Sequence, residues 1–292
     1  MRKEVISINS LGRQLSELGV QSGDLLFIAA DLMKLGYFKK NRKQTLDDIV
    51  DMLFSLIGDD GTIVIPSYTE YFTRFRKQPD IIFNQNVDST SGSLSNHLLK
   101  HPRALRSSHP TNSVIAIGRY AEYIVENHDE HSSSYSPILK VIELGGKNLM
   151  LGCFNDFRLA PMALHAAQEK LGYTSKHWMS GNVQTYFYNR NGEKKLFTRY
   201  DIGGCASGAY KLLGHHFKNG AIDILKTGNS NSALIDTKKS YELIFKILQK
   251  HPEIIRCDDS RCHDCYGSSV YNPKGFILHW IAFFIKKLFS NR

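Results

Sequence analysis

The chain has 292 residues, of which 42% are hydrophobic, so it can bury a sizeable core and is not disordered. Its net charge of +9 favours anionic partners such as phosphorylated cofactors, but no basic run is long enough to indicate nucleic-acid binding. No signal peptide and no uncharged apolar stretch of ~18 residues is recognised, and five cysteines fit a reducing cytosol, so we expect a cytoplasmic protein.

The first half of the chain predicts helices alternating with buried strands. A helix over 9–19 precedes a strand over 25–30. Apolar residues at helical spacing predict a helix over 45–58, with Thr45 as its cap and Asp48 in the position of a capping box. A second strand over 62–66 follows the turn at 59–61. Strand, helix and strand in this order are typical of a parallel sheet in an α/β fold.

The second half continues this pattern and adds a hairpin. Helices are predicted over 91–101, 121–128, 159–173 and 240–251, and buried strands over 113–118 and 147–153. Residues 181–200 alternate polar with apolar side chains around Asn191-Gly192, which predicts a β-hairpin.

The composition changes near residue 255, which divides the chain into 1–255 and a tail, 256–292. Residues 275–289 form an apolar segment with Lys286 and Lys287 near its end. This segment is too short for an ordinary membrane-spanning helix. It could lie in a membrane interface at the inner face, or pack on the body of the protein or on a partner chain, including a second copy in a homodimer.

The ordered motifs resemble those of the aminoglycoside 3-N-acetyltransferase family. They are LGVQSGDLLFIAADLMKLG (18–36), GDDGTIVIPSYT (58–69), SSHPTNSVIAIG (107–118), SPILKVIELGGKNLMLG (136–152), ALHAAQ (163–168) and KTGNSNSALID (226–236). The resemblance implies a three-layer α/β/α sandwich of that family's type, here with a β-hairpin insertion and a C-terminal helical tail. It makes residues 1–255 an acyltransferase domain. It also implies acetyl-CoA as donor, no metal, an amino group on a sugar as acceptor, and direct transfer within a ternary complex.

His165 is the expected general base, because an imidazole titrates near the working pH. Its family-matching partner is Gln168, which could orient the ring but would stabilise its charged form less well than a carboxylate. Glu169 lies four residues along the same helix face and is the alternative partner. The resemblance makes Thr69 a hydroxyl near the thioester carbonyl. Structural explanations for these residues are a helix histidine bonded to a backbone carbonyl and a turn threonine.

The resemblance also assigns residues to the two substrates. Acetyl-CoA is expected at the loop after the first strand and at the segment before the third: Asp31, Leu32, Met33, Ser108, His109, Thr111 and Ser113. Asp31 could instead be a helix cap, and the second segment a proline-fixed turn. Candidate acceptor contacts are Tyr68, Glu70, Asn112 and Asp156.

Three positions depart from the family pattern. The stretch Ile28-Ala29-Ala30-Asp31 at the end of the first strand stands where the family has a histidine and small hydroxyl residues, Asn112 replaces a histidine, and Gln168 replaces a carboxylate. These changes favour a sugar of a surface glycan, free or nucleotide-linked, over a clinical aminoglycoside. They also leave open a family member that binds a sugar, coenzyme A or a partner protein without catalysing transfer.

The cysteines suggest two further alternatives. Cys257, Cys262, His263 and Cys265 could complete a tetrahedral zinc site, although free thiols are the preferred interpretation and no metal is expected. Cys153 follows a buried strand, so a cysteine amidase that uses Cys153 and His165 is conceivable; a buried structural cysteine is more usual.

Overall fold

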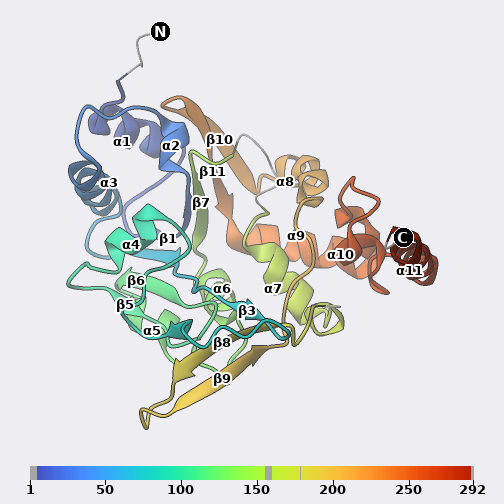
Figure 1. Cartoon of the computed structure of the whole chain (residues 1–292). Helices are drawn as coiled ribbons and strands as arrows, with labels where there is room; N and C mark the ends of the chain where they lie inside the picture. Colours follow the sequence, from blue (N-terminus) through green and yellow to red (C-terminus); the bar gives the residue numbers. More distant parts are fainter. Residues whose placement is uncertain (1–4, 155–159, 178, 291–292) are drawn as a thin grey trace.

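The computed structural model describes residues 5–154, 160–177 and 179–290. Within this part of the chain, a seven-stranded sheet runs through the centre in the order β10-β11-β7-β1-β2-β6-β5 (Figure 1). Its strands are β1 (Leu25–Ala30), β2 (Thr62–Pro66), β5 (Leu105–Arg106), β6 (Val114–Gly118), β7 (Lys147–Leu151), β10 (Ile222–Thr227) and β11 (Ser230–Asp236). The predicted α/β class is confirmed.

The sheet is mixed rather than wholly parallel. β1 pairs in parallel with both β2 and β7, as the strand–helix–strand order predicts. β6 runs antiparallel to β2, and β11 runs antiparallel to β7. The apolar run of β6 could not reveal this direction, because a strand buried on both faces has the same pattern in either orientation.

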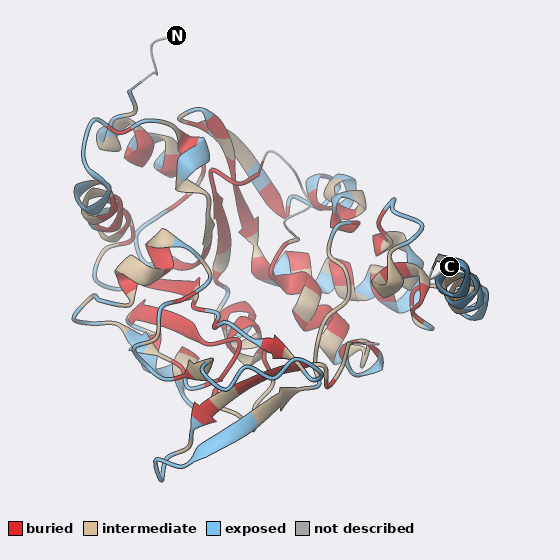
Figure 2. Cartoon of the chain, in the orientation of Figure 1, coloured by how far each residue is buried: buried red, intermediate tan, exposed pale blue. Residues whose placement is uncertain are grey.

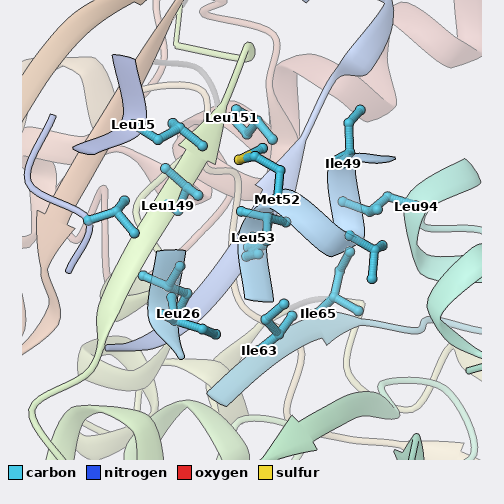
Figure 3. Close-up of a cluster of buried hydrophobic side chains, with 14 of the residues drawn as sticks. Leu15, Leu26, Ile49, Met52, Leu53, Ile63, Ile65, Leu94, Leu149 and Leu151 are labelled. Carbon is cyan, nitrogen blue, oxygen red and sulfur yellow. The ribbon is translucent and has the colours of Figure 1, made fainter. Parts of the chain in front are cut away.

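Helices cover both faces of the sheet and give three layers. One face is covered by α1 (Ile8–Glu17), α3 (Arg42–Ile57) and α4 (Ser93–Leu98). The other is covered by α5 (Ala121–Val125), α6 (Ser136–Glu143), α7 (Ala163–Lys170) and α9 (Thr237–Lys250). β1 serves both cores, since Leu26 packs with the first set and Phe27 with the second. Figure 3 shows Leu26 and Leu149 of the sheet beside Leu53 of α3.

Two helices begin earlier than their sequence signals suggest. α3 starts at Arg42 because the side chain of Asn41 accepts a hydrogen bond from the backbone amide of Gln44, so Thr45 is inside the helix and is not its cap. Similarly, Ser7 caps α1 by accepting from the amide of Ser10.

The predicted hairpin is present and belongs to a second, smaller sheet. β8 (Val183–Tyr188) and β9 (Lys194–Arg199) form the hairpin, and β3 (Phe72–Thr73) and β4 (Ile82–Phe83) also pair with β8. Gly192 in the connection has φ +76°, a left-handed conformation that the Asn-Gly pair accommodates.

Short elements complete the described chain: α2 (Leu32–Leu35), η1 (Thr174–Lys176), η2 (Ala209–Leu212), α8 (Leu213–Lys218), η3 (Pro252–Ile255), α10 (His263–Tyr266) and α11 (Phe276–Ser290). α11 lies at the edge of the molecule beside α10 (Figure 1). Much of its surface is exposed (Figure 2). Among the described residues, no helix is long and apolar enough to cross a membrane.

Candidate active site

Two loops meet at one end of the strands of the central sheet. One follows β2 and the other precedes β6. Because the two strands are antiparallel, the N-terminal end of β6 lies beside the C-terminal end of β2. The backbone amide of Ser67 donates to the carbonyl of Ser113 at 2.8 Å, and that of Thr69 donates to the carbonyl of Thr111 at 3.1 Å. The hydroxyl-rich segment before β6 therefore lies at the carboxyl ends of the parallel strands β1 and β2, where α/β sheets usually bind ligands.

His165 lies on α7, and its Nδ1 atom is held by a neighbour one turn along the helix. Gln168 Oε1 lies 2.9 Å from His165 Nδ1, and Gln168 Nε2 donates to the hydroxyl of Tyr271 at 2.7 Å. Since an amide oxygen only accepts, Nδ1 carries the ring proton and Nε2 keeps a lone pair. Within the described chain, Nε2 has no hydrogen-bond partner.

Burial sets the ionisation of this ring. It lowers the pKa of His165, and the hydrogen bond to Gln168 opposes the shift only in part. The ring is therefore neutral near pH 7, which is the state that a general base requires.

Tyr135 and Gly203 pack around the His165 ring. The Tyr135 and His165 rings stack with centroids 5.3 Å apart and an interplanar angle of 17°. A Cβ atom at Gly203 would lie 2.5 Å from His165 Nδ1, so a larger residue would displace the ring. The Tyr135 hydroxyl accepts from the Gly203 amide at 2.9 Å and from Arg199 Nη2 at 2.8 Å, which fixes both covering groups.

A chain of polar contacts leads from Tyr135 to His109. Arg199 Nε donates to Asp201 Oδ1 at 3.0 Å, and the Ser134 hydroxyl donates to the same oxygen at 2.8 Å. The Ser134 oxygen in turn lies 3.2 Å from His109 Nε2. The segment before β6 is thus connected to the surroundings of His165 through Ser134, Asp201 and Arg199.

His109 is held as a neutral ring in the interior. Its Nδ1 accepts the backbone amides of Thr111 and Asn112 at 3.3 and 3.0 Å, so Nε2 carries the proton. The ring stacks on His128 with centroids 4.8 Å apart, and each residue is 1% exposed. Burial lowers the pKa of His109 to about 3 and that of His128 to about 2. Neither ring exchanges protons near neutral pH.

Three buried hydroxyls near this edge have no hydrogen-bond partner in the described chain, namely those of Ser67, Thr69 and Thr111. An unpaired buried hydroxyl is costly, typically ~1–3 kcal/mol, unless a ligand or water satisfies it. The Thr69 hydroxyl therefore remains a candidate donor to a thioester carbonyl, and this role stays a prediction.

The remaining candidates for acetyl-CoA contacts vary in exposure. The Asp31 side chain caps α2 by accepting from the amide of Lys34 at 3.3 Å, as the structural alternative proposed. Leu32 is half-buried, Met33 is 90% exposed, and Ser108 is exposed. Their contact with acetyl-CoA stays a prediction, as it does for His109, Thr111 and Ser113, whose side chains are buried.

Among the acceptor candidates, Tyr68 interacts with residues that surround His165. It interacts electrostatically with Tyr135 and Arg199, and burial of its hydroxyl raises its pKa to about 12 although 37% of the residue is exposed. Glu70 is exposed and Asn112 is buried. Asp156 lies outside the described residues.

Glu169 does not hydrogen-bond to His165; that contact is made by Gln168. One oxygen of Glu169, Oε2, is buried without a hydrogen-bond partner in the described chain. Burial raises its pKa, and a hydrogen bond with Ser133 opposes this in part, while Asp201 adds to the rise. Glu169 therefore contributes a second carboxylate near Asp201.

Cys153 has the environment of a structural thiol. It contacts the carbonyl of Ala29 at 3.4 Å, and burial raises its pKa to about 11. A thiol with this pKa is a poor nucleophile near pH 7. No hydrogen bond joins it to His165 in the described part of the chain.

The cysteines of the tail gather with a fourth that the sequence did not suggest. Cys205, Cys257, Cys262 and Cys265 have sulfur atoms that all lie within 4.8 Å of one another. His263 is not a member of this group, and its Nδ1 lies 2.9 Å from Nε2 of His279.

Sequence reasoning missed the residues that reach the site from far along the chain, namely Ser134, Tyr135, Arg199, Asp201, Gly203, Cys205 and Tyr271. Local signals were present, since Arg199 lies at the end of the predicted hairpin, Asp201 follows it directly, and Gly203 lies in a glycine pair. Nothing in their spacing related them to His165.

Known sequences match most of the part of the chain that forms the central sheet and this site. A family model described as aminoglycoside 3-N-acetyltransferase matches residues 27–249. Aminoglycoside N(3)-acetyltransferase III from Salmonella sp is 31% identical over 212 residues, which are 65% of this chain and 70% of the relative. The enzyme of the same name from Acinetobacter baumannii is 30% identical over 210 residues, which are 64% of this chain and 69% of the relative.

Solved structures share the fold at lower identity. The apoenzyme of aminoglycoside acetyltransferase AAC(3)-IVa has a TM-score of 0.72 and 20% identity, covering 91% of this chain and 97% of its own. AAC-IIIb, in a binary complex with CoASH, has a TM-score of 0.64 and 20% identity, covering 85% and 97%. AAC-VIa bound to sisomicin has a TM-score of 0.67 and 22% identity, covering 84% and 98%.

Proposed function

Since the chain belongs to the aminoglycoside 3-N-acetyltransferase family, and is thereby an acetyl-CoA-dependent N-acetyltransferase, we propose that its acceptor is an amino group on a sugar and that His165 is its general base. The observation that carries the base assignment is the hydrogen bond from His165 Nδ1 to Gln168, which leaves the Nε2 lone pair available. Two solved relatives support this proposal. One is bound to CoASH, the thiol that acetyl-CoA becomes after it has given up its acetyl group, and the other to sisomicin, which carries amino groups on sugar rings.

In the proposed reaction, the acceptor ammonium first loses one proton to solvent, the neutral amine attacks the thioester carbonyl, and His165 Nε2 takes a second proton from the attacking nitrogen. A C–N bond forms, the tetrahedral intermediate expels the coenzyme A thiolate, and the imidazolium returns the proton to that sulfur. A hydroxyl such as that of Thr69 would donate to the oxyanion. Gln168 keeps the ring in the required tautomer but adds no negative charge to stabilise the imidazolium.

The carboxylates of Glu169 and Asp201 are the proposed binding groups for the acceptor ammonium. The two influence each other electrostatically, and Glu169 Oε2 is a buried acceptor without a partner in the described chain. A cationic amine would satisfy that oxygen and offset the repulsion between the carboxylates. The hydroxyl of Tyr68, which interacts electrostatically with Arg199, is a further proposed polar contact for the acceptor.

We propose an amino sugar of a surface glycan, free or nucleotide-linked, as the acceptor. Support comes from Asp31, Asn112 and Gln168, which replace residues of the family pattern in three separate segments. The test is turnover of acetyl-CoA against a panel that contains nucleotide-linked amino sugars, free amino sugars and aminoglycosides. Faster turnover of an aminoglycoside than of every other amino sugar would contradict the assignment.

A non-catalytic binding protein is the second candidate, and Gln168 in place of a carboxylate is the observation that favours it. Turnover of acetyl-CoA against the acceptor panel separates the two, and His165→Ala tests the assignment of the base. We expect kcat to fall by about 10²–10⁴-fold in this variant, the usual contribution of a general base, while His131→Ala on an exposed loop keeps full activity. Tight sugar binding without turnover anywhere in the panel would favour the non-catalytic reading.

We also propose that α11 brings the enzyme to an anionic membrane surface. Trp280 and Phe283 face the body, where Trp280 Nε1 donates to the carbonyl of Gly267 at 2.9 Å and the Phe283 ring contacts His263. The opposite face exposes seven large apolar side chains: Ile277, Leu278, Ile281, Phe284, Ile285, Leu288 and Phe289. This apolar face, with Lys286 and Lys287 beside it, matches an interfacial helix.

Replacing Ile281 and Leu288 by aspartate removes apolar contact area without touching Trp280. We expect the double variant to lose co-sedimentation with anionic vesicles and to keep its acetyltransferase activity. Membrane contact would be refuted if the wild-type protein does not bind vesicles. If it is also a dimer that the double variant makes monomeric, this face binds a second copy of the chain.

A further inference from the structure

We propose that Cys205, Cys257, Cys262 and Cys265 bind one Zn²⁺ ion as four thiolate ligands. Their sulfur atoms lie within 4.8 Å of one another. Tetrahedral Zn–S bonds of ~2.3 Å require sulfurs ~3.8 Å apart, so small side-chain rotations bring the group to zinc geometry. The cluster has no acidic or histidine member, and four soft thiolates select zinc or iron over Mg²⁺ or Ca²⁺.

The backbone around the cluster has the features of a thiolate site. The amide of Cys257 donates to Cys265 Sγ at 3.3 Å, and the amide of Ser207 donates to Cys205 Sγ at 3.4 Å. Such N–H···S contacts stabilise negative sulfur and orient it toward a metal. Cys262 and Cys265 lie three residues apart, the first at the N-cap of α10 and the second within this helix.

Two distant segments approach closely to form this cluster. A Cβ atom at Gly208 would lie 2.0 Å from the carbonyl oxygen of Ile255, so the loop that carries Cys205 reaches the tail only because residue 208 is glycine. Lys211 donates to the carbonyl of Arg256 next to Cys257. The contact is therefore built into the fold and does not depend on the four sulfurs alone.

The proposed metal is structural and not catalytic. Four protein ligands leave no open position, and the chemistry of the family needs no metal. Cys205 lies two residues after Gly203, which packs on His165, and Cys265 lies six residues before Tyr271, which hydrogen-bonds to Gln168. A zinc ion here would hold both covering segments together. This consequence for activity rests on the proposed role of His165, whereas metal binding does not.

The test is elemental analysis of the full-length protein purified without added metal or chelator. We expect about one zinc ion per chain, released when the thiols are titrated with a mercurial, and a lower Tm after chelation that zinc restores. Replacement by Co²⁺ should give the intense visible absorption of tetrahedral thiolate coordination. Cys205→Ser and Cys262→Ser, at partly exposed positions, should lose the metal, while the matched control Cys153→Ala should keep it.

Two results would overturn the assignment. Zinc far below stoichiometric amounts in the purified protein, with no Co²⁺ or Zn²⁺ taken up when either ion is added back, would show that the cluster binds no metal. Iron in place of zinc would refute the identity of the ion.

Tyr271→Phe separates structure from catalysis, because it should retain zinc and yet lower kcat. Full zinc with no acetyltransferase activity would leave this site standing and would reject the proposed function.

Discussion

Gln168→Glu restores a carboxylate beside the proposed base and gives the sharpest test of His165. The amide oxygen lies 2.9 Å from Nδ1, so a carboxylate at this position would stabilise the imidazolium directly. At an effective dielectric constant of ~20, unit charges ~4 Å apart attract by about 4 kcal/mol. Burial of the new carboxylate offsets part of this attraction. We expect the pKa of His165 to rise by about 1–2 units, equivalent to ~1.4–2.7 kcal/mol.

The direction in which the pH profile moves follows from the form of His165 that acts as the proposed base, which is the neutral ring. Burial lowers the pKa of His165 below its usual value in the native chain, so the base is neutral down to mildly acidic pH. A higher pKa in Gln168→Glu moves the acid limb of kcat/KM to higher pH. The assay is kcat/KM against pH with one acceptor throughout, together with NMR titration of the His165 ring. An unmoved limb in Gln168→Glu would refute Gln168 as the partner of His165, and a limb that shifts only in Glu169→Gln would assign that role to Glu169.

Two further predictions concern stability and packing. Because burial depresses the pKa values of His109 and His128, the unfolded chain binds more protons below pH ~6.5, and the pair should lower the free energy of unfolding by about 4 kcal/mol between pH 7 and pH 5. Urea titrations should show about half of that loss removed in His128→Gln; an unchanged pH dependence would contradict the buried neutral pair. Gly203→Ala should displace His165, lowering kcat ~10–100-fold and stability by ~1–3 kcal/mol. Gly214→Ala, where an added Cβ meets nothing within 4 Å, should change neither quantity, and equal activity in both variants would refute the close packing.

Local sequence patterns predicted the central elements well because both faces of the sheet are buried. The observed bounds of β1 and β2, 25–30 and 62–66, are those that the apolar runs indicate. The β10–β11 hairpin was not predicted from periodicity. Beside its turn, the hydroxyls of Thr227 in β10 and Ser232 in β11 are buried against each other, so polar strand residues occupy the interior here.

In the candidate site, contacts between residues close in sequence could be predicted, and contacts between distant residues could not. His165 and Gln168 are three residues apart on one helix, and their contact follows from helical spacing. Tyr271 reaches Gln168 across 103 residues, and Cys205 joins a cluster centred more than 50 residues later. No periodicity relates such positions, so only the fold shows that Cys205, and not His263, is the fourth member of the cluster.

The contact between Gln168 and Tyr271 also sets an order of assembly during synthesis. Chains emerge from the ribosome N-terminus first, and earlier segments can fold before later ones exist. The core that packs Leu26, Leu53 and Leu149 needs nothing after Leu234, whereas the surroundings of His165 are incomplete until Tyr271 has been made. A nascent chain can therefore pack one face of its sheet while the proposed surroundings of His165, and the core on the other face, still wait for residues after Leu234.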